Sequence, residues 1–296
     1  MPPKKPEALE SGEDRDHRTR RFLGREPLAR VQRAHVLVVG LGAVGNEVAK
    51  NLALAGVGGL TLVDPDRVEL SNLNRCIFFR ERDVGKPKVH VARRGLRAAA
   101  PATETAVHVR PIEECPQEVW HADAVALCVD EEFARYYVNA RLLGAGRPIP
   151  VVNGAMGRTW AEVSVLIPGQ TACLACLWSE GYLHQVLGEQ VRRECDEFFQ
   201  ETRPAFPTIS VLTSLAGAIS STEVIKLLAR TPRSLPAALG QRIRYDICEN
   251  RATVHDILPN PRCVDAMCRK RRQTSDRAAP WAKSATPGEP KVGDEP

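Results

Sequence analysis

The sequence has few aromatic residues and no long apolar run. Phe, Trp and Tyr make up 5% of the 296 residues, so we expect a core built mainly from Val, Leu, Ile and Ala. No stretch of 18 apolar residues occurs, which argues against a helix that spans a membrane. The N-terminal segment also lacks the apolar region of a secretory signal peptide. We therefore expect a cytoplasmic protein that has no membrane partner.

The remaining composition is that of a folded protein with a sizeable core. Hydrophobic residues make up 43% of the chain, enough for one large domain or two modest ones. Thiols stay reduced in the cytosol, so the nine cysteines are predicted to be metal ligands, a nucleophile or small core residues rather than disulfides.

The two ends of the chain are polar. The formal net charge is +5, and residues 269–296 carry seven Lys or Arg against four Asp or Glu. Their low apolar content predicts disordered tails at 1–17 and 269–296. The basic run that starts at Arg269 is compatible with nucleic acid, but we expect a solvated tail and no nucleic acid partner.

Apolar runs typical of strands alternate with segments of helical periodicity, which predicts a parallel α/β sheet. The predicted strands of this half are 35–40, 60–64, 105–109, 122–129 and 148–153. The predicted helices between them are 44–56, 88–100 and 131–144.

After Asn153 the pattern changes. We predict a strand at 162–167, a long helix at 209–228 and an antiparallel strand pair at 242–248 and 252–257. The fold class is therefore α/β: a Rossmann-like, doubly wound sheet whose parallel half is extended by antiparallel C-terminal strands. We place a nucleotide-binding half at about 18–153 and a protein-substrate half at about 154–268.

A glycine turn lies between the first predicted strand and the first predicted helix. Gly40, Gly42 and Gly45 have the spacing G-x-G-x-x-G, which allows a tight turn and close approach of a phosphate to the helix N-terminus. Asp64 follows the next strand, where a carboxylate can accept hydrogen bonds from ribose hydroxyls. This pattern alone does not separate ATP from a dinucleotide.

Polar and cationic residues beyond Asp64 favour ATP. They are Asn72, Asn74, Arg75, Lys86 and Lys88. A triphosphate carries more charge than a dinucleotide, and its cleavage needs positive groups near the developing negative charge. Asp130 follows a strand of the sheet, where a carboxylate beside phosphates is suited to Mg²⁺. An NAD-dependent oxidoreductase and a non-catalytic binding module are the alternatives.

One continuous stretch resembles a known family. It reads GLGAVGNEVAKNLALAGVGGLTLVDPDRVELSNLNRCIFF, with DVGKPKV behind it. These runs are similar to the adenylation domain of ubiquitin-activating (E1-like) enzymes and their bacterial relatives ThiF, MoeB and HesA, and the resemblance covers about residues 18–268. It implies an enzyme that binds ATP and Mg²⁺ and adenylates the C-terminal glycine of a small β-grasp protein, a ubiquitin-like modifier or a sulfur carrier. It also implies a homodimer with composite sites.

The resemblance also implies roles for individual residues. Asp64 would bind ribose, Asp130 would bind Mg²⁺, and the residues that would contact phosphates are Asn72, Arg75 and Lys88. Arg135 matches a further arginine of the bacterial members. An arginine near the N-terminus would reach the partner subunit's site, and the best matches are Arg20 and then Arg21. The chain departs from the family at Ala43, where a second glycine is usual, and at Glu131, where an asparagine is usual.

Four cysteines form two close pairs that are far apart in the sequence. They are Cys173, Cys176, Cys263 and Cys268. Such pairs suit a tetrahedral zinc site that holds the C-terminal segment to the body of the domain. The family commonly has Cys-x-x-Cys at both places, whereas the second pair here has four intervening residues. Buried thiols without metal are the alternative.

Cys195 lies in a charged stretch, about 180–207, that we expect to be a crossover loop over the active site. In relatives that form a thioester, a cysteine lies near the position of Arg203. Arg192 and Arg193 favour a Cys195 thiolate, and the acidic neighbours oppose it. Two roles remain open: a thioester that passes the carrier to a conjugating enzyme, and an ordinary surface thiol.

Overall fold

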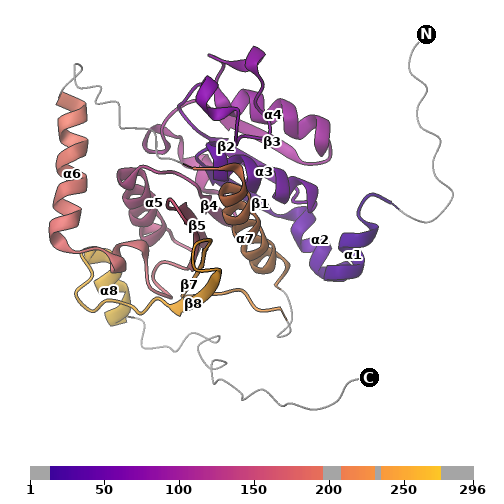
Figure 1. Ribbon diagram of the computed structural model, residues 1–296. Coiled ribbons are helices and arrows are strands. Elements are labelled where there is room, and N and C mark those ends of the chain that lie inside the picture. Colours follow the sequence, from indigo (N-terminus) through magenta and orange to yellow (C-terminus); the bar gives the residue numbers. More distant parts are fainter. Residues whose placement is uncertain (1–13, 196–207, 231–234, 275–296) are drawn as a thin grey trace, which may run out of the picture.

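The structure is a computed structural model that describes residues 14–195, 208–230 and 235–274. Eight strands form one sheet in the order β3-β2-β1-β4-β5-β6-β7-β8 (Figure 1). The strands are β1 (His35–Val39), β2 (Gly59–Val63), β3 (Glu104–His108), β4 (Ala124–Leu127), β5 (Val151–Met156), β6 (Trp160–Leu166), β7 (Gln241–Asp246) and β8 (Arg251–Asp256).

Helices cover both faces of this sheet. The α-helices are α1 (His17–Leu23), α2 (Arg25–Arg33), α3 (Ala43–Leu54), α4 (Lys88–Ala99), α5 (Glu132–Gly144), α6 (Glu180–Cys195), α7 (Ser210–Ala229) and α8 (Ala266–Thr274). Short 3₁₀ segments are η1 (Leu70–Asn72), η2 (Glu81–Asp83), η3 (Ile112–Glu114), η4 (Gln117–Trp120) and η5 (Leu174–Leu177).

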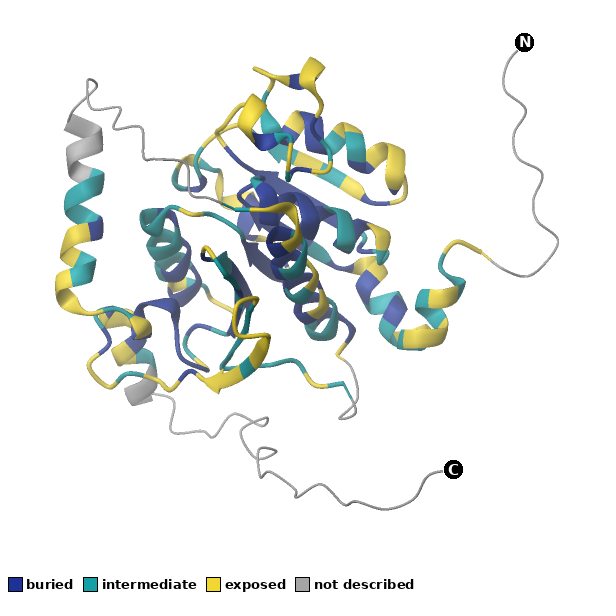
Figure 2. Cartoon of the chain, in the orientation of Figure 1, coloured by how far each residue is buried: buried dark blue, intermediate teal, exposed yellow. Residues whose placement is uncertain are grey.

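The five N-terminal strands are parallel, and their side chains form two cores. Successive residues of a strand point to opposite faces. Val36 and Val38 of β1 pack with α3, α4 and α7, while Leu37 and Val39 pack on the face of α5. Figure 2 shows the buried residues gathered in the central strands and on the inner sides of these helices. The carboxyl ends of β1, β2 and β4 therefore meet at one edge, which is where the candidate site lies.

The C-terminal half extends the sheet by antiparallel pairing. β5 pairs with β6, β6 with β7, and β7 with β8. On β6, Val163 and Val165 face the α7 side, while Glu162 and Ser164 face the other side. β8 is an edge strand, and most of its residues are exposed. The predicted fold class is confirmed, including the change from parallel to antiparallel after β5.

Helix α7 has the length and apolar composition of a membrane span. It is the one such helix among the described residues, and half of the apolar window is buried against other parts of the structure. It packs against α3, α2, β5 and β6. Its buried half therefore belongs to the core of the fold.

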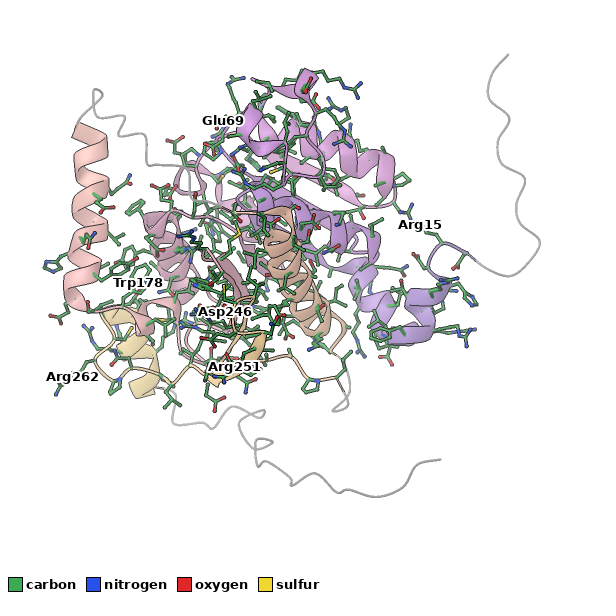
Figure 3. The ribbon with its side chains drawn as sticks, in the orientation of Figure 1. Arg15, Glu69, Trp178, Asp246, Arg251 and Arg262 are labelled. Atoms are coloured by element: carbon green, nitrogen blue, oxygen red, sulfur yellow. The ribbon has the colours of Figure 1, made fainter. Side chains whose placement is uncertain are left out.

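Helices α1, α2, α6 and α8 were not predicted from the sequence. The expected crossover loop is wrong for residues 180–195, because they form α6, while residues 196–207 lie outside the described residues. The predicted C-terminal tail is wrong for residues 269–274, because α8 continues to Thr274. Helix α6 is held by an aromatic contact and helix α8 by a cysteine contact. Both contacts form only in the folded chain, so the sequence pattern does not reveal them. Trp178 lies between Tyr136 of α5 and Tyr182 of α6, with ring centroids 6.1 and 5.4 Å apart (Figure 3).

One buried carboxylate in α7 gives a stability prediction. Glu223 is 2% exposed, and its oxygens accept hydrogen bonds from Lys226 Nζ and from the backbone N–H of Ala238, each at 2.7 Å. Replacing Glu223 by Ala leaves both donors unpaired, so we expect the free energy of unfolding to fall by about 3 kcal/mol. Urea unfolding measures this change. The exposed helical pair of Glu26 and Arg30 is the control, and Glu26→Ala is expected to cost less than about 0.5 kcal/mol. Equal losses in the two variants would contradict the prediction.

Candidate functional site

In the glycine turn after β1, the packing requires glycine at two of the three positions and leaves room for a side chain at the third. Gly40 has φ +88°, and a Cβ there would lie 2.7 Å from the carbonyl oxygen of Cys128. A Cβ on Gly45 would lie 1.9 Å from the carbonyl oxygen of Gly40. A Cβ on Gly42 would meet nothing within 4 Å. Gly42 is the N-cap of α3 and has no side-chain cap, so the N–H groups of the first turn face an open surface where an anion can bind.

Asp64 holds this turn from the neighbouring strand. Its Oδ2 accepts a hydrogen bond from the backbone N–H of Leu41 at 2.5 Å, and its Oδ1 accepts one from the N–H of Asp66 at 2.8 Å. The side chain lies directly after β2 and is 5% exposed. Burial raises the pKa of Asp64, and the positive charge of Lys88 acts in the opposite direction. The predicted ribose ligand thus also fixes the shape of the glycine turn.

Lys88 begins α4 and lies close to two carboxylates. Its Nζ donates to Asp66 Oδ2 at 2.7 Å, and its backbone N–H donates to the carbonyl of Asp66 at 2.9 Å. Burial favours loss of the proton, but Asp64 and Asp66 outweigh this effect and raise the pKa of Lys88. Lys88 is therefore an ammonium ion whose present partner is the more exposed Asp66, a group that an incoming phosphate can replace.

Asn72 and Arg75 are held by their own loop. Asn72 is 8% exposed, and its Oδ1 accepts a hydrogen bond from the N–H of Glu69 at 3.0 Å. Arg75 Nη1 donates to Asn74 Oδ1 at 2.9 Å and to the carbonyl of Ser71. Arg75 is therefore folded back on the loop, and contact with a phosphate requires exchange of these surface hydrogen bonds.

The thiol of Cys76 shows which predicted residues the fold brings together. Cys76 is 4% exposed, and burial raises its pKa to about 11. Arg75 and Lys88 act to lower that pKa and Asp64 acts to raise it, so all three charges lie close to one sulfur. Two predicted phosphate ligands and the predicted ribose ligand thus lie within electrostatic range of one sulfur.

Asp130 and Arg135 approach the turn from β4. A Cβ on Gly40 would lie 3.0 Å from Val129 Cγ1, which places the end of β4 beside the turn. Arg135 Nε and Nη2 both donate to the carbonyl of Val129, at 3.2 and 2.6 Å. This contact holds the chain just before Asp130. Asp130 itself is exposed and makes no hydrogen bond within the part of the chain that the structure describes, so its carboxylate is available for a cation.

Asn46 and Asp66 are two residues of the site that the sequence analysis missed. Asn46 is fully buried in α3; its Nδ2 donates to the carbonyls of Leu41 and Gly42, and its Oδ1 accepts the N–H of Phe78 at 3.3 Å. It connects the glycine turn to the loop that carries Asn72 and Arg75. A polar residue directly after Gly45, on the buried side of the helix, is the signal that would have found it.

One predicted site residue, Arg20, is not brought to the site of its own chain, and the side chain of a second, Cys195, lies outside the described residues. Arg20 lies on α1 and pairs with Asp14 at 2.5 Å. Helix α1 contacts α2, and a Cβ on Gly56 would lie 4.0 Å from Asp16, which places α1 near the amino end of β2, opposite the site. Cys195 is the last residue of α6, and its side chain lies outside the described residues.

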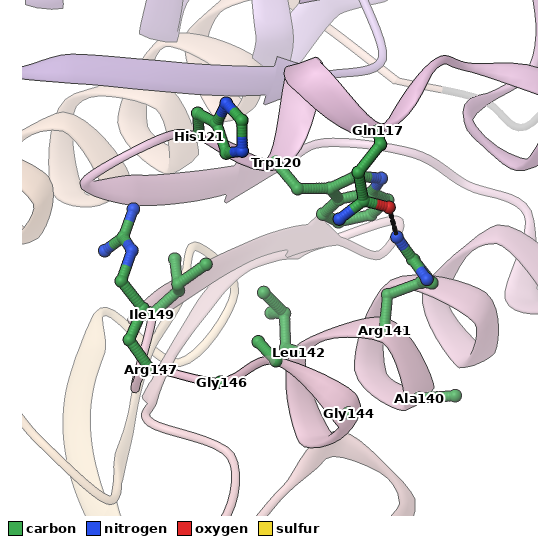
Figure 4. Close-up of a pocket in the computed structure, with 11 residues that line it drawn as sticks. Gln117, Trp120, His121, Ala140, Arg141, Leu142, Gly144, Gly146, Arg147 and Ile149 are labelled. Carbon is green, nitrogen blue, oxygen red and sulfur yellow. Dashed lines mark hydrogen bonds between the residues drawn. The ribbon is translucent and has the colours of Figure 1, made fainter.

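Two cavities lie near the sheet, and only one adjoins the site. The first, of about 490 Å³, lies at the opposite edge and is lined by Trp120, His121, Arg141 and Arg147 among others (Figure 4). Arg141 there donates to Gln117 and lies 5.4 Å from the Trp120 ring centroid, so it has partners within the fold. The second, of about 460 Å³, is lined by Arg135 and by residues of β5–β7, η5 and α6. We call this second cavity the sheet groove.

The four predicted metal ligands come together. Sγ–Sγ distances are 3.7 Å between Cys173 and Cys176, 3.7 Å between Cys173 and Cys263, and 3.8 Å between Cys176 and Cys268. All four sulfurs lie within 4.8 Å of one another, and all four residues are buried. A tetrahedron with metal–sulfur bonds of about 2.3 Å has edges of about 3.8 Å. The four sulfurs therefore fit a tetrahedral metal ion.

Two buried polar residues hold the cysteine pairs in place. Asn139 of α5 accepts the N–H of Leu174 at 2.9 Å and donates to Asp265 Oδ2 at 3.3 Å. Asp265 Oδ1 accepts the N–H groups of Met267 and Cys268, at 2.9 and 3.3 Å. One hydrogen-bonded path thus joins both cysteine pairs to the helix that follows Asp130, as outer partners of metal ligands commonly do.

Comparison with known proteins gives consistent matches. The model of the ThiF family matches residues 14–265. The sulfur carrier protein adenylyltransferase of Thermus thermophilus is 30% identical over 251 residues, which are 81% of this chain and 85% of that protein. The Nedd8-activating enzyme E1 catalytic subunit of Drosophila melanogaster is 32% identical over 156 residues, 49% of this chain. Among solved structures, E. coli MccB with ATP has a TM-score of 0.68 at 24% identity, and the match covers 88% of this chain and 75% of that chain.

The extent of these matches differs. The chain spans about a third of the first curated relatives, 35% and 38% of the Nedd8-activating subunits from Drosophila melanogaster and Caenorhabditis elegans. The match to the Thermus protein is longer. The likeness to MccB, at 24% identity, is a likeness of fold.

The glycine geometry predicts that two substitutions in one turn have different effects. Gly45→Ala places a methyl group 1.9 Å from a backbone oxygen, so the turn must shift, and we expect the free energy of unfolding to fall by about 1–3 kcal/mol or more. Gly42→Ala adds a methyl group to open space, so stability is expected to change by less than about 0.5 kcal/mol. Thermal unfolding tests both. In Gly42→Ala, the affinity for ATP is nevertheless expected to fall, because the methyl group occupies the surface before the α3 N-terminus. Unchanged ATP affinity in this variant would mean that no phosphate contacts the turn.

Proposed function

Because the chain belongs to the ThiF family, we propose that it is an E1-like adenylyltransferase. Its substrates would be ATP and a small β-grasp protein, a ubiquitin-like modifier or sulfur carrier that ends in glycine. The observation that carries the proposal is the set of charged groups at the carboxyl edge of the parallel strands. Asp64 directly follows β2, Asp130 follows β4, and Lys88 begins α4 within electrostatic range of Asp64, while a Cβ on Gly42 in the glycine turn would meet nothing within 4 Å.

The position of each group in this set is consistent with one role in binding ATP or Mg²⁺. Asp64 would bind the ribose, while the N-terminus of α3, Arg75 and Lys88 would neutralise the phosphates. The exposed carboxylate of Asp130 fits Mg²⁺, which prefers oxygen ligands and would supply further positive charge to the phosphates. Arg135 keeps the end of β4 in place through the Val129 carbonyl.

The proposed reaction is a substitution at the α-phosphate of ATP. A carboxylate oxygen of the terminal glycine attacks the α-phosphorus, the bond from that phosphorus to the bridging oxygen breaks, and pyrophosphate leaves with the electron pair. The carboxylate is already ionised at pH 7, so no general base is needed. The chain's contribution is therefore to position two anions and to neutralise their charge.

Arg20 fits this proposal only in a dimer. It lies near the opposite edge of its own sheet, so it can take part in the chemistry only from a second subunit. We therefore propose a homodimer in which Arg20, or its neighbour Arg21, reaches the partner's phosphates. Breaking the Asp14–Arg20 pair would be part of that movement.

The sulfur-carrier class has one specific observation in its favour. Similarity to the Thermus sulfur carrier protein adenylyltransferase runs along 81% of the chain. Similarity to the Drosophila Nedd8-activating subunit runs along 49%. The longer match favours adenylation of a sulfur carrier over activation for conjugation. Thioester formation at Cys195 and a conjugating enzyme as partner belong to the second of these possibilities.

ATP–pyrophosphate exchange tests the proposed function. The purified protein is incubated with ATP, Mg²⁺ and labelled pyrophosphate, with and without small Gly-ended β-grasp proteins encoded near its gene. We expect exchange only with a matching carrier protein, and a carrier that lacks its last glycine is the control. ATP binding without exchange for any carrier would refute catalysis, and absence of ATP binding would refute the nucleotide site.

Two substitutions test the charged groups. We expect Lys88→Ala and Asp130→Ala each to lower the exchange rate about 100-fold or more, by loss of one group that stabilises the transition state. Arg97→Ala is the matched control, since Arg97 is an exposed cation at the other end of α4, and its rate is expected to stay within about twofold of wild type. A near-normal rate in Lys88→Ala or Asp130→Ala would remove that residue from the mechanism.

We further propose that the four cysteines bind a structural zinc ion, with one ion per chain. In zinc-finger peptides such an ion contributes about 10–16 kcal/mol to folding. Cys263→Ser is therefore expected to lose the metal and to lower the unfolding midpoint by more than about 10 °C. Elemental analysis and thermal unfolding measure the two effects. Cys248→Ser is the control, because Cys248 is exposed and outside the cluster. A wild-type protein without zinc, or full zinc content in Cys263→Ser, would contradict the proposal.

A further inference from the structure

Two polar residues lie opposite each other on β5 and β6 in the floor of the sheet groove. Asn153 pairs with Ser164 in the antiparallel register, and both line the groove. They are 8% and 2% exposed. Within the part of the chain that the structure describes, Asn153 Oδ1 has no hydrogen-bond partner, and neither the Asn153 amide group nor the Ser164 hydroxyl makes a side-chain hydrogen bond.

The buried, unpaired Asn153 Oδ1 is expected to cost stability in the free protein. A buried polar group without a partner costs about 1–3 kcal/mol. Two residues along on each strand, at the same face, the pair is Val151 and Leu166, and both of these side chains are fully buried in the core under α5. An apolar pair at Asn153 and Ser164 would continue this core without that cost. The polar pair therefore has the properties of groups whose partner arrives with a ligand.

The charged groups of the groove lie close to opposite charges or acceptors. Arg242 Nε lies 3.1 Å from Glu162 Oε1 in an ion pair but makes no hydrogen bond within the described residues, and Arg135 donates to the Val129 carbonyl and lies 3.9 Å from Glu132. An amide and a hydroxyl without hydrogen-bond partners lie beside them on the floor. Neutral donors and acceptors of this kind match another neutral amide, such as a peptide unit, better than a phosphate or a carboxylate.

The groove leads to the predicted chemistry. Asn153 lies beside Leu127 of β4, three residues before Asp130. An extended chain advances about 3.3 Å per residue, so a peptide unit above Asn153 and a C-terminus near Asp130 are separated by about three residues, or about 10 Å. Apolar residues of η5 and the rings of Trp178 and Tyr182 line one part of the same groove, and its other lining residues are mostly polar or charged.

We propose that Asn153 and Ser164 bind the main chain of the substrate protein's C-terminal tail, about three residues before its terminal glycine. This assignment rests on the proposed function. Asn153 Oδ1 accepts a hydrogen bond from a tail N–H, and Asn153 Nδ2 and Ser164 Oγ donate to a tail carbonyl. The two residues position the tail without reading its side chains. They select for an extended chain that has an N–H group at this point, and they do not contact ATP.

The test compares Asn153→Leu, Ser164→Ala and the double variant with the wild type in pyrophosphate exchange, using the carrier that the wild type accepts. We expect the KM for the carrier to rise about 10-fold or more in the double variant, since each hydrogen bond contributes about 0.5–1.5 kcal/mol. The KM for ATP is expected to stay within about twofold. Carrier variants with one proline at each of the last six positions form a second arm. The carrier with proline near the third position before the end is expected to lose exchange with the wild-type enzyme. With Asn153→Leu, the same proline is expected to reduce exchange only slightly compared with the unchanged carrier.

The same variants are also examined by thermal unfolding without substrate. Because they remove unpaired polar groups, we expect an unfolding midpoint equal to or above that of wild type. Thr61→Val is the matched control: Thr61 is also a buried strand residue, but its Oγ1 lies 2.8 Å from His35 Nε2, so its loss is expected to lower the midpoint and leave both KM values unchanged.

An unchanged carrier KM in the double variant, with an active wild type, would overturn this assignment alone. A clearly lowered midpoint in both single variants would also overturn it, because it would show that the two groups have partners in the free protein. A wild type without exchange for any carrier would overturn the proposed function, and this assignment with it.

Discussion

The site depends on the close packing of the turn after β1 against the end of β4. Gly40 lies so near the Cys128 carbonyl that no side chain fits between them. Asp64, from the strand on the other side of β1, holds Leu41 by a hydrogen bond. Three neighbouring parallel strands are thereby fixed at one edge, and the N-terminus of α3 is directed to the same point. The charged groups that follow β2 and β4 share one edge of the sheet because these strand ends are locked together.

The groove and the cysteine cluster add a second constraint from the C-terminal half. Segment η5, which begins after Cys173 and contains Cys176, supplies a wall of the sheet groove, and Trp178 directly after it packs against aromatic rings of α5 and α6. Asn139 connects this segment to α5, which begins just after Asp130. The cysteine cluster therefore supports the wall of the groove from behind, and α5 links that wall to the nucleotide edge.

Much of this architecture could be predicted from the sequence, and the exceptions have physical causes. The strands and the helices α3, α4, α5 and α7 carry strong apolar periodicity, so pattern alone located them within a few residues. Helix α6 contains two glycines and many charges, and its contacts are a few aromatic rings rather than a continuous apolar face. Helix α8 is rich in Lys and Arg, and Cys268 within it belongs to the sulfur cluster, a contact formed only in three dimensions. Within the site, the glycines and most charged residues belong to recognisable motifs. Asn46 binds neighbouring backbone and Asp66 pairs with Lys88, and no sequence motif records such contacts.

The position of the sulfur cluster has a consequence for regulation by nutrients. In the proposed reaction the two substrates use different supports: ATP would be held by the parallel half, which contains none of the four cysteines, and the groove is walled by the cysteine segment. If the four cysteines hold a metal ion as proposed, a chain made without that ion would lose the support of the groove wall together with much of its stability. Supply of a trace element would then set how many copies can complete the reaction.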